Sequence, residues 1–161
     1  MESSSTSRHA LRIEPRQSFP EVIVLDTNVL SELMRPAPDA GVVAWLGARD
    51  PFELATTTIT IAEIQRGIVR LPDGRRRKSL EQRFSAFVEA AFPGRLLAFD
   101  RDAAYACGEV SASRERNGLH ADAVDMMIAA IVKTAGATLA TQNTRDFEAC
   151  GIALADPWRS Y

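Results

Sequence analysis

A short apolar run that ends at an aspartate constrains the fold of this chain more than any other feature. Residues 22–25 read Val-Ile-Val-Leu, and Asp26, Thr27 and Asn28 follow directly. A wholly apolar run rich in β-branched residues is typical of a buried strand in a parallel sheet, and open sheets of this kind bind ligands at the carboxyl ends of their strands. Asp26 is therefore either the N-cap of a following helix or a carboxylate that holds a cation, and this stretch alone leaves both interpretations open.

Length and composition indicate an ordinary globular domain. The chain has 161 residues, of which 46% are hydrophobic and 25% are charged, and its formal net charge is −2. Bulk charge therefore gives no argument for a nucleic-acid partner, and any such argument depends on local patches. Cys107 and Cys150 form no CxxC pair, and no apolar run approaches the roughly 20 residues needed to span a bilayer. We expect a soluble, cytoplasmic protein.

Residues 1–20 differ in character from the rest of the chain. They are rich in serine, contain Pro15 and Pro20, and show no sustained hydrophobic period. We therefore expect a disordered leader over residues 1–20 and a single folded domain over residues 21–161.

Beyond residue 20, the hydrophobic periods of strands and helices alternate. Strands are expected at residues 22–25, 52–57, 96–99, 138–141 and 152–154, and helices at 29–34, 39–48, 60–69, 75–91, 102–117 and 121–135, with a helical turn at 145–149. Val42, Val43 and Leu46 are expected to face inward. This alternation predicts a three-layer α/β/α fold with a short, mostly parallel central sheet.

Acidic and amide side chains follow the carboxyl ends of the expected strands, where parallel strands place them in one crevice. These residues are Asp26, Glu63 in the first turn of its helix, Asp122, Asp125, Asn143 and Asp146. Carboxylates with an amide and hydroxyls form a site of hard oxygen ligands, for which Mg²⁺ or Mn²⁺ is the expected occupant. His9 lies in the expected leader and His120 in a loop, so a zinc site or a histidine-based triad finds little support.

Each acid also has an ordinary structural interpretation. Thr60 and Glu63 match a capping box, in which the glutamate reaches back to the N-cap backbone N–H, and this interpretation competes evenly with a metal-binding one. Asp122 is interpreted as the cap of its helix, whereas Asp125, on the border of the buried helix face, is interpreted as functional. Asp100 and Asp102 are expected to be caps, and Asp146 to open a helical turn.

Four stretches carry a resemblance to a known family. Residues 25–32, 60–67, 125–130 and 140–147 resemble, in order, the motifs of the PIN-domain family, most closely the VapC-type toxins of bacterial toxin–antitoxin pairs. The resemblance extends from about residue 22 to residue 158. It implies a PIN-like α/β/α domain over residues 21–161 and a magnesium-dependent ribonuclease. It also implies a protein that is usually dimeric and is held inactive by a cognate antitoxin.

The resemblance also assigns roles to individual residues. Asp26, Glu63 and Asp125 match the three acids of the family's catalytic metal site. The small polar positions that orient the acids or bound water are matched by Thr27, Asn28 and Thr141. Where many members have a fourth acid, this chain has Asn143, whose amide oxygen can still accept a hydrogen bond from water on the metal. The amide lowers the local negative charge, so the number of metal ions stays open, and a second is expected only if Asp146 compensates.

A basic run is the candidate for RNA binding. It consists of Arg75, Arg76, Arg77 and Lys78, and Arg66 and Arg70 lie on the preceding helix. Such a run is often a solvated helix face, but four positive charges at a helix N-terminus are unfavourable with respect to the helix dipole, which favours contact with phosphate. Other possible contacts to the RNA backbone are Arg35, Arg114 and Arg116.

The expected reaction is endonucleolytic hydrolysis of RNA by a metal-activated water, which leaves 5′-phosphate and 3′-hydroxyl ends. A phosphatase of the haloacid-dehalogenase type would need a second aspartate two positions after Asp26, where this chain has Asn28. The alternative function is a catalytically silent PIN-like module that binds RNA or protein.

Overall fold

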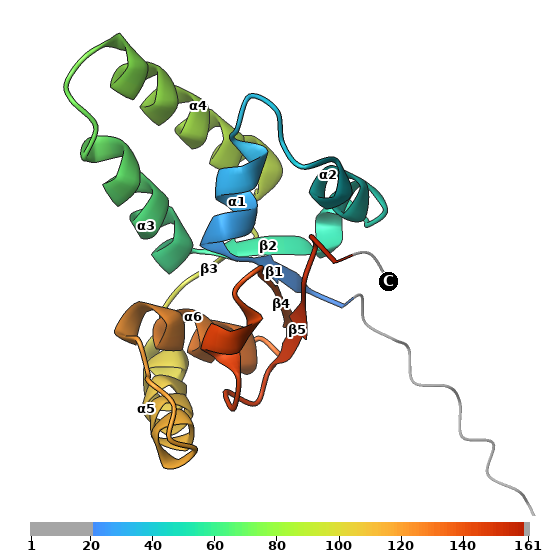
Figure 1. Ribbon diagram of the computed structural model, residues 1–161, viewed down its shortest axis with the longest axis vertical. Helices are drawn as coiled ribbons and strands as arrows, with labels where there is room; N and C mark the ends of the chain where they lie inside the picture. The colour runs from blue at the N-terminus through green and yellow to red at the C-terminus, as the bar shows by residue number, and fades with distance from the viewer. Residues whose placement is uncertain (1–20, 160–161) are drawn as a thin grey trace, which may run out of the picture.

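Five short parallel strands form the centre of the protein (Figure 1). The computed structural model describes residues 21–159, so the leader expected at residues 1–20 lies outside the described residues. The strands are β1 (Ile23–Leu25), β2 (Leu54–Thr57), β3 (Leu96–Leu97), β4 (Thr138–Ala140) and β5 (Ala153–Ala155). They lie in the order β3-β2-β1-β4-β5, and each neighbouring pair is parallel. The sheet of the described chain is thus wholly parallel, where the sequence predicted a mostly parallel one.

Helices cover both faces of this sheet. One group consists of α1 (Thr27–Leu33), α2 (Ala40–Gly47), α3 (Thr58–Val69) and α4 (Arg75–Ala91), and the other of α5 (Arg101–Arg116) and α6 (Ala123–Thr134). Two short 3₁₀ helices, η1 (Pro51–Glu53) and η2 (Thr144–Phe147), complete the described elements. Figure 1 shows the two groups on opposite sides of the strands, which confirms the three-layer α/β/α architecture.

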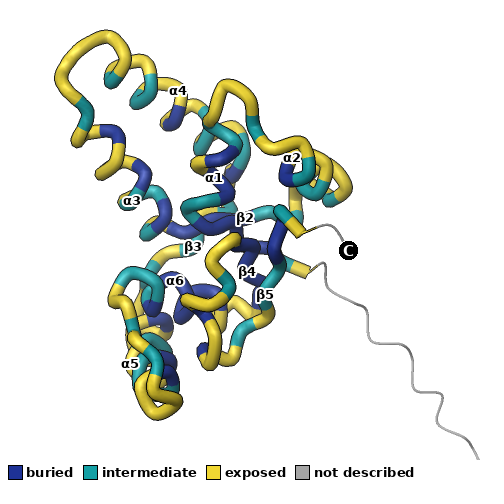
Figure 2. Tube along the Cα trace, in the orientation of Figure 1, coloured by how far each residue is buried: buried dark blue, intermediate teal, exposed yellow. Residues whose placement is uncertain are grey.

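The strand β1 contributes to two hydrophobic cores, because successive side chains of a strand point to opposite faces. Ile23 and Leu25 pack with the apolar faces of α1 to α4. Val24 packs with the other core, which includes Val110 of α5 and Met126 of α6. The central strands β1, β2 and β4 are accordingly mostly buried, whereas the edge strands β3 and β5 are partly exposed, as are the outer faces of the helices (Figure 2).

The expected elements are all present, with shifts of a few residues at their ends. The helix α1 begins two residues earlier than expected because Asp26 caps it, and residues 51–53 form η1 because Asp50 caps that turn and Pro51 opens it. Val43 was expected to face inward, but it is 47% exposed, since α2 is short and buries mainly Val42. Asp102 is not a cap either, because Asp100 already caps α5 by accepting from the backbone N–H of Ala103.

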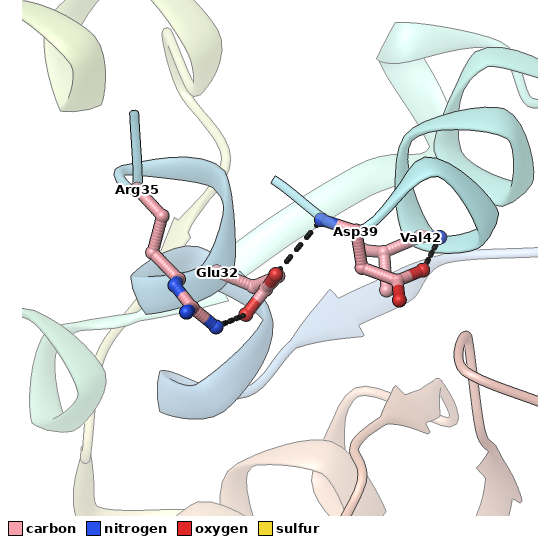
Figure 3. A network of polar contacts seen from close by, with 4 residues as sticks. All are labelled: Glu32, Arg35, Asp39 and Val42. Carbon is pink, nitrogen blue, oxygen red and sulfur yellow. Dashed lines mark hydrogen bonds and ion pairs between the residues drawn. The ribbon is translucent and has the colours of Figure 1, made fainter. Parts of the chain in front are cut away.

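A buried glutamate fixes the connection between α1 and α2 (Figure 3). Glu32 accepts a hydrogen bond from the backbone N–H of Asp39 at 2.8 Å and from the Arg35 guanidinium at 3.2 Å. Asp39 in turn caps α2 by accepting from the backbone N–H of Val42 at 3.0 Å. The end of α1 and the start of α2 are therefore held together by one side chain.

None of the helices within residues 21–159 combines the length and the apolar character needed to cross a membrane. Cys107 and Cys150 are both free thiols.

Candidate active site

Asp26 lies directly after β1 and is only 5% exposed. Its Oδ1 accepts a hydrogen bond from the backbone N–H of Thr27 at 2.8 Å, which makes it the N-cap of α1. Its backbone N–H donates to the Ala140 carbonyl at 3.0 Å, and this bond continues the pairing of β1 with β4. Its second oxygen, Oδ2, faces the end of β4. Capping uses only Oδ1, so the N-cap role does not exclude the cation-binding role predicted from the sequence.

The hydroxyl of Thr141, at the end of β4, organises this part of the site. It donates to Asp26 Oδ2 at 2.7 Å and accepts from the Asn28 side-chain amide at 3.2 Å and from the Asn143 backbone N–H at 3.0 Å. A hydroxyl offers one proton and two lone pairs, so this group is fully used. The Asn28 carbonyl oxygen also accepts from the backbone N–H of Gln142 at 3.3 Å. Together these bonds hold Asp26 in one orientation.

Glu63 lies in the second turn of α3, not in the first turn as the sequence predicted. The capping-box interpretation is wrong, because α3 begins at Thr58 and its N-cap is Thr57, whose hydroxyl accepts from the Thr60 backbone N–H at 2.9 Å. The Glu63 carboxylate instead accepts a hydrogen bond from the Thr27 hydroxyl. Glu63 is therefore held toward the start of α1, beside Asp26.

Asp122 and Asp125 lie at the start of α6. Asp122 caps the helix through hydrogen bonds from the backbone N–H groups of Val124 at 3.0 Å and Asp125 at 3.1 Å, which confirms the prediction for this residue. Asp125 occupies the first turn and is partly buried.

The acids influence one another electrostatically. The pKa of Asp125 rises from its ordinary value of 3.8 to about 7, first because burial disfavours the charged form and then because of the negative charges of Asp122, Asp26, Asp146 and Glu63. Burial also raises the pKa of Asp26, and the charges of Glu63 and Asp146 add to this, while the hydrogen bonds from Thr141 and Thr27 oppose it. Carboxylates from β1, α3, α6 and η2 thus share one region of negative potential.

Asn143 and Asp146 reach the site from η2. Both are exposed. Asn143 contributes its backbone N–H to Thr141, and its side chain makes no capping bond to η2. Asp146 lies in the first turn of η2, and its charge raises the pKa of both Asp26 and Asp125. Asp146 is thus electrostatically part of the acidic group, together with Asp26, Glu63, Asp122 and Asp125.

Arg114 has a structural position that the sequence did not predict. It was a candidate contact for RNA, but it is only 6% exposed. Its guanidinium donates to the carbonyls of His120 at 2.6 Å, Arg145 at 3.1 Å and Glu148 at 2.8 Å. These carbonyls belong to the loop before α6 and to η2 with the residue after it, the segments that carry Asp125 and Asp146. Arg114 therefore joins two acidic parts of the site. No local signal reveals this, because its partners are main-chain carbonyls, and two of them lie 31 and 34 residues away.

The basic run lies at the N-terminus of α4, whose bounds agree with the expected ones. Arg77 donates to Asp73 at 2.7 Å and to Glu81 at 3.2 Å, so its charge is locally compensated. Arg75, Arg76 and Lys78 are exposed, as are Arg66 and Arg70 of α3. The helices α3 and α4 extend together away from the sheet (Figure 1), so these cations lie on one projecting hairpin.

The donor set of the site suits a hard divalent cation. It offers carboxylate oxygens from Asp26, Glu63 and Asp125. The contact expected of the Asn143 amide stays a prediction, because only the backbone N–H of Asn143 is seen to bond, to Thr141. Within residues 21–159, no three acidic, cysteine or histidine side chains are grouped so that they could hold a metal ion by themselves. Magnesium does not need a complete protein cage, because it commonly keeps several waters and is bound through one or two carboxylates together with substrate phosphate oxygens.

Comparison with known proteins identifies the family. The model of the PIN domain matches residues 23–152. The plasmid stability protein StbB of Pseudomonas syringae pv. tomato is 38% identical over 86% of this chain and 100% of its own length. The VapC ribonuclease Y4jK of Sinorhizobium fredii is 38% identical over 85% of this chain and 98% of its own. The structure of FitAB bound to an IR36 DNA fragment contains a chain with 34% identity and a TM-score of 0.82, covering 87% of this chain and 98% of that one. This chain therefore belongs to the PIN-domain family, within its group of VapC-type toxin nucleases.

Proposed function

We propose that this protein is a magnesium-dependent endoribonuclease, the toxin of a toxin–antitoxin pair, and that it hydrolyses RNA phosphodiesters. The observation that carries the proposal is the acidic group around Asp26, in which neighbouring negative charges contribute to raising the pKa of Asp125 to about 7. Such a group favours a cation and, through it, a phosphate. Similarity to the VapC ribonuclease Y4jK supports RNA as the substrate.

Asp26 and Asp125 are the proposed direct ligands of the cation, with Glu63 as the third acid. When bound, Mg²⁺, or Mn²⁺ in its place, supplies Lewis-acid activation of the attacking water and the scissile phosphate. The residues of the chain provide the positions. Thr141 orients Asp26 through its 2.7 Å hydrogen bond, and Thr27 orients Glu63. The exposed Asn143 amide is proposed to contact the cation through water. Hydrolysis by water leaves 5′-phosphate and 3′-hydroxyl ends.

Cleavage of a randomised RNA pool tests this function. We expect cleavage with Mg²⁺, none with EDTA, and ends that carry 5′-phosphate and 3′-hydroxyl groups. Asp26→Asn should abolish cleavage. The matched control is Asp100→Asn, because Asp100 caps α5 with the same kind of bond, at 2.9 Å, yet is not among the charges that raise the pKa of Asp26 or Asp125. Equal cleavage by wild type and Asp26→Asn would overturn the proposal.

Glu63→Gln tests the third acid separately. The glutamine oxygen can still accept from the Thr27 hydroxyl, so the local structure is retained while the negative charge is removed. We expect the cleavage rate to fall by about two orders of magnitude, as for other positioned carboxylates of active sites. A wild-type protein that binds RNA but never cleaves it would instead support the silent binding module.

The proposed partners of the toxin are a cognate antitoxin and a second copy of this chain, as the similarity to VapC toxins implies, and the proposed location is the cytoplasm. Light scattering coupled to gel filtration tests the dimer through the molecular mass. Co-expression with the cognate antitoxin tests neutralisation, because the bound antitoxin should suppress the cleavage of the RNA pool.

A further inference from the structure

A hollow beside the candidate active site has no role in the chemistry described so far. Its volume is about 280 Å³, and it lies between α1, α3 and α4. Its lining consists of Thr27, Ser31, Met34, Glu63, Ile64, Gly67, Ile68, Leu71 and Leu80. Two of these residues, Thr27 and Glu63, also belong to the candidate active site, where their side chains are hydrogen-bonded to each other. The hollow is therefore continuous with the acidic group.

One face of α3 forms the wall of this hollow. Glu63, Gly67 and Arg70 are spaced by four and three residues, which places them in a row along the helix. The row begins with an acid of the site, continues with a residue that has no side chain, and ends with an exposed cation. A Cβ placed on Gly67 would meet no atom within 4 Å, so this glycine leaves the wall open.

The chemistry of the hollow suits a nucleobase. Its floor is apolar and includes Ile64, Ile68 and Leu80, which can cover the flat face of a base, while the exposed Ser31 hydroxyl can bond to a base edge. Its volume is just below the range of pockets that hold drug-sized ligands, which begins at roughly 300 Å³, so a ligand as small as a single base fits its size. Single-stranded nucleic acids are typically bound by apolar platforms for bases, combined with a cationic path for phosphates.

That cationic path lies on the same helical hairpin. Arg66 and Arg70 of α3 are exposed. The exposed cations of the basic run, Arg75, Arg76 and Lys78, follow at the start of α4. A chain of phosphates that leaves the acidic group along α3 would therefore meet positive charge, which favours RNA over a neutral or basic peptide as the occupant.

We propose that this hollow is a nucleobase subsite, which holds the base next to the scissile phosphate of single-stranded RNA and so helps to select the cleavage position. The proposal rests on the proposed ribonuclease function and adds a specificity-determining residue, Gly67.

Gly67→Leu is the test, because it adds a bulky side chain at the wall of the hollow from a position where a Cβ meets no atom within 4 Å. Replacing a helical glycine also favours folding, so the thermal midpoint should stay equal or rise. Gly67→Ala leaves most of the hollow open. The matched control is Gly108→Leu, because Gly108 is an exposed glycine inside α5 whose Cβ would likewise meet no atom within 4 Å.

The readout is the set of cleavage positions in a randomised RNA pool with Mg²⁺, followed by kinetics on the most frequently cleaved sequence. We expect Gly67→Leu to change the base preference next to the cut and to lower kcat/KM by about tenfold, mainly through KM, as expected when a base is no longer bound by its platform. Gly108→Leu should keep the wild-type positions and rate, and Gly67→Ala, which adds only a methyl group, should shift them less than Gly67→Leu does.

The outcomes separate the two proposals. If wild type does not cleave RNA, the ribonuclease function fails, and the subsite fails with it. If wild type cleaves and Gly67→Leu cleaves the same positions at the same rate, only the subsite is overturned. If cleavage is unchanged in Gly67→Leu but a co-expressed antitoxin no longer neutralises it, the hollow belongs to the protein partner, which also overturns the subsite.

Discussion

The hydroxyl of Thr141 donates a 2.7 Å hydrogen bond to Asp26 Oδ2 across the ends of two neighbouring strands, β4 and β1. Both residues are buried, with exposures of 0% and 5%. The bond therefore stabilises the charged form of a carboxylate that burial otherwise disfavours.

Thr141→Val should reduce both stability and metal affinity. The substitution keeps the shape of the side chain but leaves Asp26 Oδ2, the Asn28 amide and the Asn143 N–H without their partner. We expect a loss of about 1–3 kcal/mol in urea unfolding and weaker binding of Mg²⁺ in calorimetry. Thr138→Val is the control, because Thr138 lies at the opposite end of the same strand and donates to Glu21. Equal Mg²⁺ affinity in Thr141→Val and wild type would contradict the orienting role.

The acidic group predicts a pH-dependent stability in metal-free buffer. Asp125 has a pKa of about 7 in the folded protein, so it binds its proton more tightly there than in the unfolded chain. Its protonation therefore contributes stability that is complete below about pH 4 and is lost as the pH rises to about 7. The measurement is urea unfolding of wild type and Asp125→Asn at pH 4.5 and at pH 8, with EDTA present. The free energy of unfolding of wild type minus that of the variant should be smaller at pH 8 than at pH 4.5. A difference that is independent of pH would contradict this.

Arg114→Met should damage the site from a distance. The buried guanidinium holds three carbonyls, and methionine leaves them without donors. We expect a loss of about 3 kcal/mol in the free energy of unfolding, together with faster hydrogen exchange in the loop before α6 and in η2. Arg116→Met is the control, since Arg116 is exposed on the same helical turn. Exchange that stays slow in both segments would show that Arg114 does not join them.

The basic run should determine the salt dependence of RNA binding. In an Asp26→Asn background, the combined replacement of Arg75, Arg76 and Lys78 by alanine should flatten the plot of affinity against salt, by roughly 0.7 in slope for each phosphate that these cations neutralise. Arg77→Ala should have less effect, because Asp73 and Glu81 already compensate Arg77. The same replacements in the chain that keeps Asp26 should leave Mg²⁺ affinity unchanged. A slope equal to that of the parent protein would identify the run as a solvated helix face.

The sequence predicted the order and type of the elements well because each carries a local period. It also placed Asp26 directly after a buried strand, where the structure shows it as the N-cap of α1 next to the charge of Glu63. Its role as a metal ligand stays a prediction. The cap of α3 was harder to predict, because Thr56, Thr57, Thr58 and Thr60 all offer a hydroxyl. The length of β2 decides among them, and this length is set by pairing with β1 and β3.

The surroundings of the acids depend on contacts distant in sequence. Arg114 is followed in the sequence by two exposed charged residues, Glu115 and Arg116, so its local pattern predicts exposure. Its burial follows from three carbonyls that the fold brings to one point. The contact between Thr27 and Glu63 likewise joins residues 36 positions apart, and no spacing rule predicts it.

The placement of β4 beside β1 has a consequence for protein synthesis. Asp26 emerges early from the ribosome, but Thr141, its hydrogen-bond partner, is made 115 residues later. Asp125 and Asp146 also come from the last part of the chain. A nascent polypeptide therefore lacks an intact acidic centre until the segment from Asp125 to Asp146 has been made and has folded beside β1, so the order of synthesis delays the assembly of the site.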